Sequence, residues 1–114
     1  MSAVDATLAA LADPTRRGVI DLLRHKPHRA GELADALGAT PPAMSRHLRV
    51  LRAQGLVEEG FDDDDHRARV YRLRQQPFRA LRRWLDDVEA FWTNELDAFK
   101  RHAEATRGKG GSKR

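Results

Sequence analysis

The spacing of apolar residues changes at Gly55, and this change restricts the fold more than any other feature of the 114-residue chain. Before Gly55, apolar residues recur at steps of three and four, which is typical of amphipathic helices. After it, the segments 56–61 and 68–73 are typical of two strands, and a polar connection joins them. From Pro77 the helical spacing returns, and residues 78–105 contain neither Gly nor Pro. We therefore expect a mainly helical fold with one small β-hairpin, in the order α-α-α-α-β-β-α.

Local signals place the boundaries of the first four helices. The alanine-rich segment 4–12 is a short helix candidate, and the next helix starts at Asp13, which can cap it ahead of a proline. A two-turn helix over 30–38 ends with a glycine. Thr40 then caps a fourth helix, which we expect to run to Gln54.

Two helices joined by a short turn and followed by a hairpin make up a winged helix-turn-helix. On the second of these helices, Met44, Leu48 and Leu51 fall within about 60° of one another and are expected to face the core. Arg46 and Arg49 lie roughly opposite. The helix carries three arginines and no acidic residue, which favours an outer face that enters the major groove of DNA. The alternative is that these arginines are simply solvated.

The net charge of +4 comes entirely from the last nine residues, which hold four basic residues and no acid. Residues 1–105 are neutral, so DNA binding by the folded part must depend on where its charges lie. We expect one winged helix-turn-helix and dimerisation domain over 1–105 and a disordered basic tail over 106–114.

Several classes of protein are excluded by what the sequence lacks. It has no cysteine, which rules out a disulfide framework, a thiolate zinc site and a cysteine nucleophile. No apolar run approaches the roughly 20 residues that span a bilayer, and no signal peptide is recognisable, so we expect a cytoplasmic protein. No Ser-His-Asp order, P-loop or paired-carboxylate pocket suggests an enzyme, and we expect no cofactor.

The segments 13–23, 31–38, 41–59 and 70–73 resemble the ArsR/SmtB-type winged-helix transcriptional repressors. Within them, SRHLRVLRAQGLV is the most specific part. The resemblance implies a dimer that binds double-stranded DNA, controls its own operon and releases DNA on binding an effector. The candidate DNA-binding residues lie on the fourth helix, at its cap and on the second strand and its approach: Thr40, Ser45, Arg46, His47, Arg49, Arg52, Arg67 and Arg69.

Two departures from the family bear on DNA binding. Pro41 stands where members often have a base-reading glutamine, so no operator sequence can be carried over. The wing tip carries four consecutive acids, Asp62 to Asp65, whose charge is unfavourable beside phosphates. We expect this run to be a solvated, flexible turn that points away from the DNA backbone, although its carboxylates could also hold a hard cation.

The residues for metal sensing in this family are mostly missing. Ala34 and Ala36 occupy the helix where metal sensors commonly carry cysteines. On the last helix His102 stands alone among carboxylates, without the two-histidine pattern of zinc sensors. We therefore predict no metal site, and the effector is unknown.

Aromatic and aliphatic residues recur along the last helix at a spacing close to 3.5, which suggests packing against an identical helix. By resemblance, the first helix joins the same interface. Two-fold symmetry would place two recognition helices about one DNA turn, ~34 Å, apart on an inverted repeat. The candidate dimer-interface residues are Leu8, Leu11, Trp84, Val88, Phe91, Trp92 and Phe99.

The sequence thus predicts a homodimeric transcriptional repressor. Two alternatives remain: a metal- or small-molecule-responsive sensor of the same fold, and a dimeric module whose basic helix contacts a protein. The second alternative predicts no salt-dependent affinity for DNA.

Overall fold

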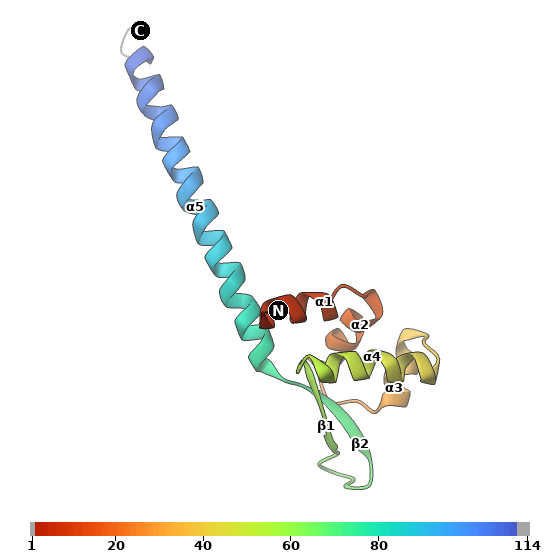
Figure 1. Ribbon diagram of the computed structural model, residues 1–114. Coiled ribbons are helices and arrows are strands. Elements are labelled where there is room, and N and C mark those ends of the chain that lie inside the picture. Colours follow the sequence, from red (N-terminus) through yellow and green to blue (C-terminus); the bar gives the residue numbers. More distant parts are fainter. Residues whose placement is uncertain (1, 112–114) are drawn as a thin grey trace. The chain divides into compact units, whose positions relative to one another are not determined.

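A computed structural model describes the backbone of residues 2–111 and the side chains as far as residue 106. The chain divides into two compact units, Met1–Leu81 and Arg82–Arg114, which are described separately below. The elements, labelled in Figure 1, are α1 (Ala3–Ala10), α2 (Pro14–Leu23), α3 (Ala30–Leu37), α4 (Pro41–Ala53), β1 (Val57–Phe61), β2 (Arg69–Leu73) and α5 (Gln75–Gly111). This order confirms the predicted arrangement of helices and hairpin.

The predicted helix caps are present. The side chain of Asp13 accepts a hydrogen bond from the Arg16 amide at 3.0 Å, and Pro14 follows as the first residue of α2. The Thr40 hydroxyl accepts from the Ala43 amide at 3.3 Å at the start of α4. These side chains satisfy amides that have no partner within their own helix.

Glycines determine how α3 ends and how closely it approaches α2. Gly38 ends α3 with a φ of +64°, a left-handed conformation that residues with a Cβ rarely adopt. At Gly18 a Cβ would lie 2.8 Å from Cδ2 of Leu37. The absence of a side chain at Gly18 therefore lets α2 and α3 pack closely.

The core of the first unit lies between α2, α3 and α4 and the base of the hairpin. Its large apolar side chains are almost completely buried, and each contributes about 1.5–3 kcal/mol relative to an exposed position. The core consists of Ala10, Val19, Leu23, Leu33, Ala34, Met44, Leu48, Leu51, Leu56 and Val57. Burial of the apolar face of α4 fixes which of its residues point outward.

β1 and β2 form an antiparallel hairpin, the wing, in which Val57 lies opposite Leu73 and Glu59 lies opposite Tyr71. Figure 1 shows the two strands and their connection extending beyond the helices of this unit. The backbone of His28, between α2 and α3, bonds to Tyr71 in both directions, at 3.3 and 2.8 Å. The wing is therefore attached to the loop that precedes α3 as well as to α4.

α5 begins at Gln75, two residues before the predicted start at Pro77, because a proline fits within the first turn of a helix. The helix is assigned as far as Gly111, beyond its predicted end at residue 105. Most of the predicted tail at 106–114 lies outside the described side chains, and its disorder stays a prediction. No helix in the described part of the chain is both long and apolar enough to cross a membrane.

Candidate nucleic-acid interface

The outer face of α4 presents three polar side chains to solvent. Ser45, Arg46 and Arg49 are exposed, and none of them forms a side-chain hydrogen bond or ion pair with the described residues. On the opposite side of the helix, Met44 and Leu48 are at most 2 % exposed, as the sequence predicts. Because the opposite face of α4 is buried, the guanidinium groups of Arg46 and Arg49 point to solvent and all their N–H donors are available.

An arginine guanidinium offers five N–H donors in a planar fork, which matches the O6 and N7 acceptors of guanine or two phosphate oxygens. Arg46 and Arg49 lie three residues apart and therefore share one side of α4. Ser45 adds a hydroxyl beside them. This combination suits a helix that reads base edges in the major groove.

Two other predicted DNA-binding residues of this helix have partners within the protein. The Thr40 hydroxyl accepts the capping bond described above. The His47 side chain is only 22 % exposed, and its Nδ1 lies 3.4 Å from Nη1 of Arg16 and 4.0 Å from a carboxylate oxygen of Asp13. The Nδ1 edge of His47 thus faces the start of α2, which leaves Nε2 as the ring nitrogen that could reach DNA.

Arg16 has a structural role that the sequence does not predict. Its Nε donates to the Ala10 carbonyl at 2.7 Å, and the neighbouring Arg17 donates to the Leu11 carbonyl at 2.8 Å. Both arginines thereby satisfy carbonyl groups at the end of α1. The Arg16 amide also lowers the pKa of Asp13 by donating to its carboxylate. These contacts join α1, α2 and α4 at one point.

Glu59 on β1 binds three side chains, and the sequence does not predict this role either. The Tyr71 hydroxyl donates to its Oε2 at 2.8 Å, Nη1 of Arg52 lies 3.4 Å from the same oxygen, and Nη1 of Arg69 bonds to Oε1. The Tyr71 hydrogen bond, followed by that from Arg69, lowers the pKa of Glu59. Burial, together with donation to Glu59, raises the pKa of Tyr71. Two predicted DNA-binding arginines, Arg52 and Arg69, thus share one carboxylate.

The acidic wing tip contains hydrogen bonds and ion pairs that the sequence did not predict. Asp62 accepts from the Asp64 amide at 3.0 Å, and Asp65 accepts from the Arg67 amide at 3.1 Å. The Arg67 side chain is 95 % exposed and lies 3.6 Å from the Asp65 carboxylate. Of the predicted wing arginines, Arg67 is therefore the more available to DNA.

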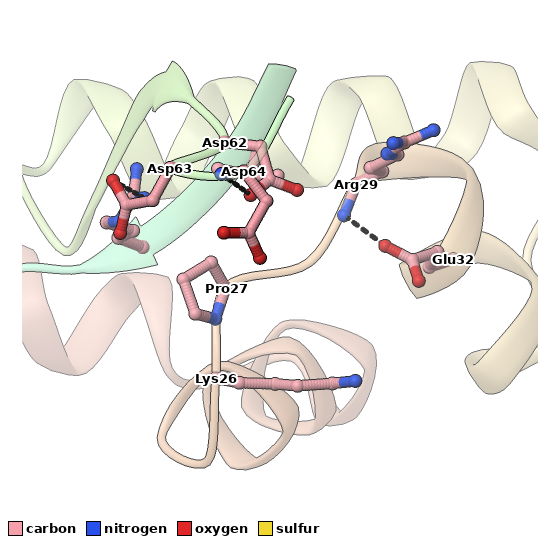
Figure 2. Close-up of a pocket in the computed structure, with 9 residues that line it drawn as sticks. Lys26, Pro27, Arg29, Glu32, Asp62, Asp63 and Asp64 are labelled. Atoms are coloured by element: carbon pink, nitrogen blue, oxygen red, sulfur yellow. Dashed lines mark hydrogen bonds and ion pairs between the residues drawn. The ribbon is translucent and has the colours of Figure 1, made fainter. Parts of the chain in front are cut away.

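A polar hollow of about 580 Å³ separates the wing tip from the loop before α3. Figure 2 shows Asp62, Asp63 and Asp64 on one side and Lys26 and Arg29 on the other. Basic side chains neutralise part of the acidic run: Arg72 lies 3.4 Å from Asp63, and Arg29 lies 3.9 Å from Asp65. Within the described residues, no group of three or more His, Cys, Asp or Glu side chains could hold a metal ion.

The predicted dimer-interface residues fall in both units. In the first unit Leu8 of α1 is 43 % exposed, whereas Leu11 is partly buried against the core. In the second unit the large apolar side chains of α5 are largely uncovered, with Trp92 58 % and Phe99 72 % exposed. Trp84 and Phe91 are exposed too, and Val88 is partly buried.

The chain is similar in sequence to known bacterial regulatory proteins. A model of the ArsR family of bacterial regulatory proteins matches residues 13–59, from the cap of α2 into β1. The HTH-type transcriptional regulator Rv2034 of Mycobacterium tuberculosis is 40 % identical over 95 residues, which cover 83 % of each chain. The regulator NmtR of the same organism is 46 % identical over 54 residues, 47 % of this chain and 45 % of that protein.

Known structures show the same fold. An ArsR-like transcriptional regulator from Rhodococcus sp. RHA1 superposes with a TM-score of 0.73 at 30 % identity, over 87 % of this chain and 91 % of that one. A homodimeric winged helix-turn-helix DNA-binding domain from Mycobacterium bovis gives a TM-score of 0.57 at 24 % identity, over 82 % of both chains. The chain therefore belongs to the ArsR family, and it is a winged helix-turn-helix transcriptional regulator rather than an enzyme.

Proposed function

We propose that this regulator is a homodimeric repressor that binds an inverted-repeat operator in double-stranded DNA and controls its own gene. The observation that carries the proposal is the outer face of α4, where Arg46 and Arg49 are exposed without a partner among the described residues. In this proposal these residues and Ser45 read base edges, and Arg67 of the wing contacts the backbone or the minor groove. A protein acting on chromosomal DNA in this way works in the cytoplasm.

The apolar side chains that α5 leaves exposed support the proposed dimer. Trp92, Leu96 and Phe99 are each more than half exposed, and covering such side chains contributes about 1.5–3 kcal/mol apiece. A second copy of the chain would cover them. The homodimeric state of the Mycobacterium bovis domain supports this arrangement. A two-fold axis would then set two α4 helices about 34 Å apart, one helical turn of DNA.

The repressor role is supported by relatives whose names state it. They include the HTH-type transcriptional repressor SmtB of Mycobacterium tuberculosis, 39 % identical over 57 residues, and the transcriptional repressor SdpR of Bacillus subtilis, 34 % identical over 50 residues. A bound dimer represses by covering a promoter.

A nuclease-protection experiment on the DNA upstream of the gene tests the proposal. We expect a protected inverted repeat whose half-sites are about one helical turn apart. The matched control is the Arg46→Ala/Arg49→Ala double variant, which should fold normally and leave the repeat unprotected. Absence of a protected repeat with the wild-type protein would contradict autorepression.

The same experiment addresses the two alternatives. Loss of protection on adding zinc, restored by a chelator, would support a metal-responsive sensor. A protein-interaction module would show no salt-dependent affinity for any duplex, because nucleic-acid binding releases counterions from the phosphates.

A further inference from the structure

The carboxylate of Glu59 connects α4 to the wing. The side chains that contact this carboxylate come from two elements. Arg52 lies in the last turn of α4, whereas Arg69 and Tyr71 lie on β2. The Glu59 side chain is 18 % exposed, whereas those of Arg52 and Arg69 are 54 % and 64 % exposed. The carboxylate is thus held below two guanidinium groups that reach the surface.

The arginines of the candidate interface therefore fall into two classes. Arg46 and Arg49 have no partner among the described residues, so their charges are available to DNA. Arg52 and Arg69 share the charge of Glu59, and Arg69 also lies over the ring of Phe61, 5.1 Å from its centroid. A phosphate contact by either member of the second class must compete with Glu59.

We propose that Glu59 is a specificity-determining positioning residue, which fixes the base of the wing against the end of α4 and withholds Arg52 and Arg69 from non-specific phosphate binding. This inference rests on the proposed DNA-binding function. Non-specific affinity is electrostatic and grows with the number of phosphates that are neutralised. Sequence preference depends instead on where the base-reading side chains lie, and the contacts of Glu59 with Arg52 and with β2 fix α4 relative to the wing.

Replacement of Glu59 should consequently raise the affinity of the protein for non-operator DNA. Glu59→Gln keeps the size of the side chain and an oxygen that accepts from Tyr71, but it removes the charge that holds the two arginines. Each arginine that moves to a phosphate steepens the dependence of log affinity on log salt by about 0.9. Affinity for unrelated sequence should increase, and the ratio of operator to non-operator affinity should fall by about 3-fold or more.

The chain provides a matched control in Glu58→Gln. Glu58 is the adjacent residue of β1, is exposed, and forms no side-chain hydrogen bond or ion pair with the described residues. Because side chains alternate along a strand, it points to the opposite face of the hairpin from Glu59. Both variants change the net charge by the same amount, so a difference between them isolates the contacts of Glu59.

The experiment measures binding of the full-length protein to two duplexes over a range of salt concentrations. One duplex is recovered by the wild-type protein from a random-sequence pool, and the other is a scrambled version of it. We expect a steeper salt slope and a lower affinity ratio for Glu59→Gln than for Glu58→Gln. Equal slopes and ratios in these two variants would overturn the proposal, whereas failure of the wild-type protein to recover any sequence would instead contradict the proposed function.

A second comparison applies even if Glu59→Gln does not fold. Arg46→Gln/Arg49→Gln and Arg52→Gln/Arg69→Gln remove the same charge from the two classes of arginine. On the scrambled duplex Arg46 and Arg49 lose the bases that they read in the operator and contact phosphates instead. We therefore expect the first pair to lower the salt slope by up to about 1.8 and the second by less than half as much. Equal losses would show that Arg52 and Arg69 already contact phosphates, which contradicts the role of Glu59.

Discussion

At the scale of single residues, Arg49 and Arg52 lie one turn apart on α4, yet their guanidinium groups have different surroundings. Arg49 has no described partner, whereas Arg52 faces the carboxylate of Glu59. At 100° per residue, the sequence places Arg49 opposite the apolar stripe of the helix and Arg52 on its flank. It does not predict a partner for Arg52, because that partner lies on β1 and is brought near by the path of the chain after Gly55.

Arg49→Ala should weaken binding to the operator by about 1–3 kcal/mol if Arg49 reads a base, with relaxed preference at one position of each half-site. Fluorescence anisotropy on the operator and on single-base variants measures this effect. A suitable control is Arg79→Ala on the first turns of α5, which removes the same charge outside the candidate interface. Equal weakening on every sequence would show instead that Arg49 holds a phosphate.

The lowered pKa of Glu59 predicts how stability depends on pH. Because the carboxylate is favoured in the folded protein, its stabilising effect is complete above the ordinary glutamate pKa of 4.5 and is lost as pH falls through the lower folded-state value. Urea unfolding over the acidic range should therefore show a smaller loss of stability on acidification in Glu59→Gln than in the wild type. Tyr71→Phe, which removes the largest cause of the shift, should fall between them. Identical pH profiles for all three proteins would refute the prediction.

At the scale of secondary structure, the helix boundaries that depend on local chemistry were predictable. Asp13 and Thr40 cap the helices they were expected to cap, and Gly38 ends α3. The contacts of Arg16 with Ala10 and His47 were not, because they depend on how α1 and α4 pack around α2. Local signals define where an element starts, whereas tertiary packing determines which polar groups meet.

Two glycines of α3 test whether the left-handed conformation at its end requires a glycine. Gly38→Ala forces a residue with a Cβ into the left-handed region and should lower the free energy of unfolding by about 1 kcal/mol. Gly31→Ala, where an added Cβ meets nothing within 4 Å, should leave stability unchanged or raise it by up to about 1 kcal/mol. Chemical denaturation of both variants measures the difference. A loss of stability in Gly31→Ala as large as that in Gly38→Ala would contradict this explanation.

At the scale of the whole molecule, the order of elements followed from hydrophobic spacing, and the family followed from the motifs of α2 to α4. The predicted dimer depends on apolar side chains of α1 and α5 that a single chain leaves exposed. The spacing of apolar residues from Trp84 to Phe99 indicates which face of the helix is apolar. It does not indicate which residues of a second chain that face contacts.

Trp92→Ala tests the predicted dimer. Removing a side chain that a second copy would bury should raise the dimer dissociation constant about 10-fold or more. Sedimentation equilibrium measures this constant. The control is Asn94→Ala, which replaces a polar residue on the side of the helix nearly opposite Trp92. This variant should leave the dissociation constant unchanged. An unchanged constant for Trp92→Ala would exclude Trp92 from the interface.

Deletion of residues 106–114 removes four basic residues from each chain and should reduce non-specific affinity and its salt slope without changing operator choice. A full-length control with these four residues replaced by glutamine should show the same loss. If operator preference disappeared with the tail, the assignment of sequence reading to α4 would be wrong.

The first turn of α4 has a consequence for redesign of operator preference. Of its first three backbone positions, Pro41 and Pro42 carry no N–H, and the third, Ala43, donates to Thr40. None of these three residues therefore offers a free amide to a phosphate, and the start of the helix is stabilised without Ser45, Arg46 or Arg49. These three positions can consequently be exchanged together while the helix keeps its cap and its buried face. If these three positions read DNA as proposed, selection at them should change operator preference without rebuilding the fold.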